Sequence, residues 1–61
     1  MMNTIYHLGD TFTYDGCTWR VIGTQGIPGA TQVVDLRDVA DGRHGMQQHA
    51  SILNDKRARG W

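Results

Sequence analysis

The chain has 61 residues, which is enough for one domain, and six Lys and Arg residues balance six Asp residues to a formal charge of zero. No stretch approaches the roughly 18 apolar residues of a membrane span, so we do not expect membrane association. No positively charged and then apolar stretch begins the sequence, so we do not expect a signal peptide either. The single cysteine, Cys17, cannot form a disulfide within the chain. This is typical of a reducing compartment, and we therefore expect a cytoplasmic protein.

Residues that favour strands and turns outnumber those that favour helices. The chain has no glutamate, one lysine and three leucines, whereas glycine and threonine together fill 14 positions. Leucine, glutamate and lysine are strong helix formers, while threonine favours strands and glycine favours turns. This bias predicts an all-β fold.

The first half of the chain predicts a β-hairpin. Apolar and polar residues alternate in 11–14 and again in 17–22, which is the period of a half-buried strand. Asp15-Gly16 separates the two runs, and this dipeptide favours a type I′ turn because both central positions need positive φ. The apolar face of the second run carries Cys17, Trp19 and Val21.

The second half predicts further, weaker strands. Gly and Pro residues in 23–29 predict a loop, and residues 31–37 follow as a strand with Val34 and Leu36 inside. A turn at 41–45 then precedes a fourth strand over 46–51. The residues that we expect to form the core are Phe12, Tyr14, Trp19, Val21, Val34, Leu36 and Leu53.

The spacing of these elements resembles that of the SH3-like small β-barrels, a group that includes KOW- and Tudor-type modules and small barrels of mobile-element proteins. The matching residues are Leu8-Gly9-Asp10, Phe12, Tyr14, Asp15-Gly16, Trp19-Arg20-Val21-Ile22-Gly23, Val33-Val34-Asp35-Leu36 and Ile52-Leu53. The resemblance implies a small antiparallel SH3-like barrel of about five short strands. It also implies a short 3₁₀ turn near Ser51–Asp55 and a final strand over Arg57–Trp61.

The neutral total conceals two segments of opposite charge. Residues 1–55 carry three Arg against six Asp, a net charge of −3, whereas residues 56–61 carry +3. We expect 1–55 to form a single small barrel domain, followed over 56–61 by a basic tail or the last strand. In the second case Trp61 would cover the open end of the barrel.

A basic segment that contains an aromatic residue suits phosphate groups and exposed bases, so the sequence predicts a module associated with nucleic acid. The expected contacts are Lys56, Arg57, Arg59 and Trp61, supported by Arg20, Arg37 and Arg43. The alternative for the segment is a solvated tail. For the strand arginines the alternative is cross-strand pairing with Asp35 or Asp38.

No group of residues has the spacing of a catalytic or metal site. The three histidines, His7, His44 and His49, are not paired as zinc ligands usually are. Cys17 lies on the apolar face of the predicted hairpin, where an inert buried thiol is expected. We therefore predict a protein that is not an enzyme and that has no cofactor or metal.

Two other functions stay open. One is a phage or mobile-element accessory protein that binds a larger host protein, an interpretation favoured by the balanced charge and by the exposed edges of a small sheet. The other is a homo-oligomer in which barrels pack edge to edge.

Overall fold

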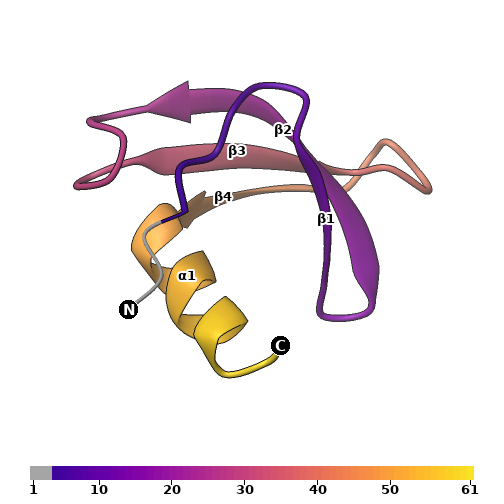
Figure 1. The fold of residues 1–61 in the computed structure, drawn as a ribbon. Coiled ribbons are helices and arrows are strands. Elements are labelled where there is room, and N and C mark those ends of the chain that lie inside the picture. Colours follow the sequence, from indigo (N-terminus) through magenta and orange to yellow (C-terminus); the bar gives the residue numbers. More distant parts are fainter. Residues whose placement is uncertain (1–3) are drawn as a thin grey trace.

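Four strands follow one another in the sheet in chain order, and each pairs antiparallel with the next (Figure 1). The computed structural model describes residues 4–61. The elements are β1 (Thr11–Tyr14), β2 (Cys17–Gln25), β3 (Val33–Asp38), β4 (Gly45–His49) and α1 (Ala50–Ala58). The expected antiparallel β structure is confirmed, but the prediction of a closed barrel of about five strands is wrong: the sheet over 4–61 is open and has four strands, with β1 and β4 at its edges.

The β1–β2 hairpin forms as predicted. Tyr14 pairs with Cys17 at the end of the ladder, so Asp15 and Gly16 alone make the turn. Their φ angles are 54° and 79°, the left-handed values that a type I′ turn requires. Glycine adopts such a φ without strain, and aspartate tolerates it better than most residues.

Strand β2 joins the two halves of the sheet. It pairs with β1 and with β3, and the register with β3 shifts between Val21 and Gly23. A bulge of this kind bends a strand and increases its twist. The turn of the β1–β2 hairpin accordingly lies on the side of the sheet that α1 covers (Figure 1).

The core lies between that face of the sheet and α1. Val21, Val34, Leu36 and Leu53 are fully buried, and Tyr6 and Ala50 complete the buried cluster. Three aromatic residues expected in the core are only half-buried and pack against the buried cluster: Phe12, Tyr14 and Trp19. Met46 packs against it in the same way. Alternation along β2 and β3 produces this face, since the intervening side chains point to the other side of the sheet.

The segment after β4 is an α-helix, so the predictions of a 3₁₀ turn at Ser51–Asp55 and of a strand over Arg57–Trp61 are wrong. Lys56 and Arg57 occupy the last helical turn, where positive charge interacts favourably with the helix dipole. Gly60 follows with φ of 80°. Its N–H donates to the Arg57 carbonyl (3.1 Å), and the Trp61 N–H donates to the Lys56 carbonyl (3.0 Å). These two bonds form a Schellman motif, which ends the helix and turns the chain back towards the sheet.

A buried polar network holds the segment before β1. The Gln32 side chain accepts from the Tyr6 N–H (3.1 Å) and donates to the Tyr6 carbonyl (2.7 Å). The Tyr6 hydroxyl donates to Asn54 Oδ1 (3.0 Å), and Asn54 Nδ2 donates to the Thr4 carbonyl (3.1 Å). Every partner in this network is satisfied, as buried polar groups must be to be tolerated.

Candidate binding cleft

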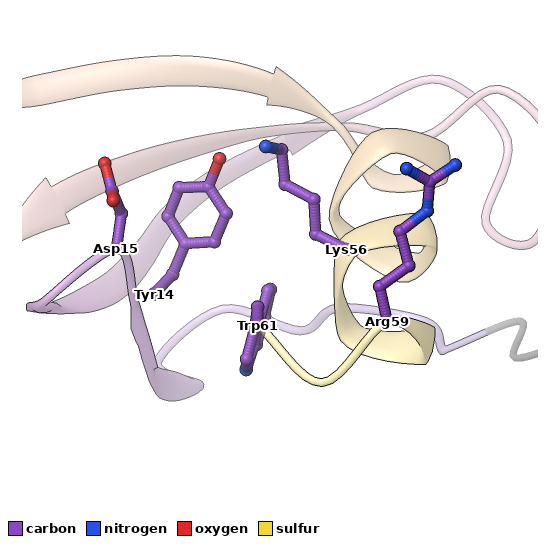
Figure 2. Close-up of a pocket in the computed structure, with 5 residues that line it drawn as sticks. All are labelled: Tyr14, Asp15, Lys56, Arg59 and Trp61. Atoms are coloured by element: carbon purple, nitrogen blue, oxygen red, sulfur yellow. The ribbon is translucent and has the colours of Figure 1, made fainter.

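A cleft lies between the turn of the β1–β2 hairpin and the C-terminal end of α1 (Figure 2). Its volume is about 320 Å³, near the lower end of the ~300–1,000 Å³ range of small-ligand pockets. Its walls are formed by Tyr14, Asp15, Lys56, Arg59 and Trp61. The Schellman motif at Gly60 creates this cleft because it directs Trp61 towards the hairpin.

The aromatic wall of the cleft is held in place from behind. The Trp61 ring stacks on Phe12, with centroids 5.5 Å apart and ring planes 14° from parallel. It also meets Tyr14 edge-on at 5.2 Å, and Phe12 in turn packs against Tyr6 at 5.6 Å. Trp61 nevertheless stays 38% exposed. It is therefore an ordered aromatic surface that is still open to a ligand.

Arg57 belongs to this aromatic cluster and does not line the cleft. Its guanidinium carbon lies 4.9 Å from the Trp61 ring centroid, 5.5 Å from that of Tyr6 and 5.8 Å from that of Phe12. Its Nε is buried and makes no hydrogen bond within residues 4–61. The contacts are cation–π interactions, which fix the end of α1 against β1.

Two cations that do line the cleft are exposed. Lys56 Nζ lies 5.5 Å from the Tyr14 ring centroid. Arg59 Nε lies 3.4 Å from Asp55 Oδ2 across one helical turn, and both side chains of this pair are largely exposed. Exposed pairs of this kind contribute only about 0–1 kcal/mol, so an anion can displace Asp55 at little cost.

The cleft is polarised from one end to the other. The Asp15 carboxylate lies at the hairpin end and the Arg59 guanidinium at the helix end, with Tyr14, Lys56 and Trp61 between them (Figure 2). A ligand in the cleft thus meets an acceptor at one end, an aromatic surface in the middle and cations at the other end.

The strand arginines lie elsewhere. Arg20 and Arg37 are exposed and directly opposite each other on β2 and β3, on the face of the sheet away from α1. Arg37 Nη1 donates to the Gly42 carbonyl (3.0 Å) in the turn that also carries Arg43. Asp35 accepts from Gln47 (3.0 Å). The structure therefore separates the seven predicted contact residues. Three of them line the cleft: Lys56, Arg59 and Trp61. Arg57 lies in the aromatic cluster, and the others lie on the opposite face of the sheet or in the turn after β3: Arg20, Arg37 and Arg43.

Cys17 and the three histidines lie outside the cleft. Burial, followed by the charge of Asp38, raises the pKa of the half-buried Cys17 thiol, which favours its protonated form. Between residues 4 and 61, no three His, Cys or Asp side chains gather in a way that would hold a metal ion. No helix in the same part of the chain is both long enough and apolar enough to cross a membrane.

Sequence reasoning missed the two hairpin residues of the cleft. The sequence pattern predicts a core position for Tyr14 and only a turn position for Asp15, because nothing local indicates that α1 lies opposite them. Gly60 was the available signal: a glycine after Lys and Arg residues is typical of a helix end whose chain reverses direction. No family model matches the chain, and neither do the curated proteins or the solved structures with which it was compared.

Proposed function

We propose that the protein is a non-enzymatic module that binds single-stranded nucleic acid in the cleft between the β1–β2 turn and α1. The observation that carries the proposal is the ordered, part-exposed Trp61 ring beside the exposed Lys56 and Arg59 side chains. An aromatic surface next to cations suits a base and its phosphate, and only an unpaired base can stack on it.

The charge of the site sets the expected strength of binding. Stacking of one base on an aromatic side chain is worth about 1–3 kcal/mol. Two cations neutralise about two phosphates, so log K should fall with log salt concentration with a slope of about −1.4 for a single strand. We therefore expect weak binding that is lost in high salt. The part of the affinity that comes from the phosphate contacts should not depend on the nucleotide sequence.

The test is fluorescence anisotropy of a labelled oligo(dT) probe, titrated at several salt concentrations. The double variant Lys56→Gln/Arg59→Gln should weaken binding and bring the salt slope close to zero. Arg20→Gln/Arg37→Gln removes the same charge from the opposite face of the sheet, and it should leave the slope near that of the wild type. Equal losses in the two double variants, or no binding of any single-stranded probe at about 50 mM salt, would refute the proposal.

We also propose that the fold is an open relative of the SH3-like small barrels, in which α1 takes the place of the last strand. The type I′ hairpin and the consecutive antiparallel strands support this kinship. The bent β2 supports it as well, since strong bending is what allows a small sheet to curl around its core.

Self-association through β4 is a second candidate function. This edge strand, with the sequence GMQQH, carries neither Lys nor Pro, the residues that usually protect an exposed edge from pairing. Sedimentation at two protein concentrations tests it. A mass that rises with concentration in the wild type, and falls back to 6.8 kDa in Gln47→Pro, would support pairing through this edge, whereas a 6.8 kDa monomer at both concentrations would exclude it.

A further inference from the structure

The carboxylate at the hairpin end of the cleft is unlike the other aspartates of the chain. Five aspartates have partners within the protein, either backbone N–H groups or side chains: Asp10, Asp35, Asp38, Asp41 and Asp55. Within residues 4–61 the Asp15 carboxylate accepts no hydrogen bond and forms no ion pair, although it lines the cleft. Both of its oxygens are therefore free to accept from a ligand.

From this polarity we propose that the cleft selects guanine. In this arrangement the Asp15 carboxylate accepts from the N1–H and the N2 amino group of guanine, while the ring lies against Trp61 and the phosphate lies near Lys56 and Arg59 (Figure 2). The inference rests on the proposed function and names the base that the same site prefers.

The choice of base follows from donor geometry. An ionised carboxylate only accepts hydrogen bonds, and it pairs best with two parallel donors, as it does with arginine. Guanine presents two adjacent donors on one edge. Adenine and cytosine each place a single amino group beside an acceptor nitrogen. Thymine and uracil place a single N3–H donor between two carbonyl oxygens, which the carboxylate repels.

The turn itself offers a substitution that isolates this carboxylate. Asp15 has a φ of 54° in the type I′ turn, and asparagine is at least as well suited to that conformation. Asp15→Asn therefore keeps the hairpin and the size of the side chain while it removes the charge and one of the two acceptors. A loss of guanine preference in this variant cannot come from loss of the turn.

The experiment compares labelled single strands of thymidine that carry one central guanosine, inosine, adenosine or thymidine. We expect the guanosine probe to bind at least about fivefold more tightly than the all-thymidine probe, as one bidentate contact requires. Inosine lacks the N2 amino group, so the affinity of the inosine probe should lie between those of the guanosine and all-thymidine probes. Asp15→Asn should bind the guanosine and all-thymidine probes alike, and the all-thymidine probe at least as tightly as the wild type does.

Failure of this inference is distinguishable from failure of the proposed function. Equal affinity of the wild type for the guanosine and all-thymidine probes overturns the guanine preference and leaves the proposed function standing. A preference that persists in Asp15→Asn also overturns the assignment to this carboxylate. Absence of binding to all four probes at low salt overturns both.

Discussion

The indole of Trp61 lies stacked on the phenyl ring of Phe12, which joins the segment after α1 to the first strand of the sheet. The centroids are 5.5 Å apart, and Tyr14 meets the same indole edge-on at 5.2 Å. The contact does two things at once. It closes the aromatic cluster over the end of the core, and it sets the position of the wall against which a ligand would lie.

Replacing Trp61 tests the first of these roles. Trp61→Ala removes both ring contacts, each worth about 0.5–1.5 kcal/mol beyond its area, so we expect the free energy of unfolding to fall by about 1–3 kcal/mol. Trp61→Phe retains a ring and should recover at least half of the loss. Urea denaturation measures both variants, and equal stability of Trp61→Ala and the wild type would contradict the packing role.

Arg57 should stabilise the fold through its planar guanidinium. Arg57→Ala removes three cation–π contacts, and we expect a loss of about 1–2 kcal/mol. Arg57→Lys keeps the charge but not the flat surface, and it should recover only part of that stability. Arg59→Ala, at an exposed position two residues further along the chain, is the control and should change stability by less than about 0.5 kcal/mol. Equal effects of Arg57→Ala and Arg59→Ala would contradict this assignment.

The difference between these two arginines shows what sequence can and cannot predict. The Asp15-Gly16 hairpin and the inward faces of β2 and β3 follow from local rules, a turn signal and a period of two. Arg57 and Arg59 look equivalent in the sequence, yet one is enclosed by aromatic rings and the other is exposed. That difference arises from contacts with β1 and Tyr6, which no local pattern encodes.

The helix was missed for a related reason. Its sequence, ASILNDKRA, buries only Ala50, Leu53 and Asn54, so it lacks the wide apolar stripe that identifies a helix. One of those three residues is polar and is buried because Tyr6 and Thr4 bond to it. Tertiary packing and the end signal at Gly60 stabilise α1, and neither shows as periodicity.

The Gln32 side chain should be essential to the fold. It satisfies both the N–H and the carbonyl of Tyr6 in a buried setting. Gln32→Leu keeps similar bulk but leaves both groups without partners, and we expect a loss of about 2–4 kcal/mol. Gln47→Leu alters an exposed glutamine on β4 and is the matched control, with an expected change of less than about 1 kcal/mol. Thermal or urea unfolding of Gln32→Leu and Gln47→Leu measures the difference, and equal losses of stability in the two variants would contradict the prediction.

Two glycines with left-handed φ should differ in their tolerance of alanine. Gly26 has φ of 82° and Gly42 has φ of 68°, so alanine is strained by about 1–2 kcal/mol at either position. At Gly26 the new Cβ would also clash with the Thr31 carbonyl oxygen, whereas at Gly42 it would meet open space. We therefore expect Gly26→Ala to be clearly less stable than Gly42→Ala. A smaller loss in Gly26→Ala would show that the loop adjusts.

Asp41 should make stability depend on pH in acid. Hydrogen bonds from the Arg43 and His44 N–H groups, with the His44 ring beside them, lower the Asp41 pKa from 3.8 to about 2. Because the pKa of Asp41 is lower in the folded state than in the unfolded state, its ionised carboxylate stabilises the fold. This stabilisation is fully present above about pH 4 and is lost as the pH falls towards 2. Asp41→Asn should flatten the unfolding free energy across that window. An unchanged pH profile in this variant would contradict the assignment.

The walls of the cleft come from residues 14–15 and 56–61, which lie far apart in the chain and meet only when the sheet and α1 are assembled. The unfolded chain therefore has no such site, and any ligand of the cleft must also act as a stabiliser of the native state. At a hundred times its dissociation constant it would add about 2.7 kcal/mol to the free energy of unfolding. For a chain of 61 residues, whose stability is small to begin with, occupancy of the cleft would be a substantial part of what keeps it folded.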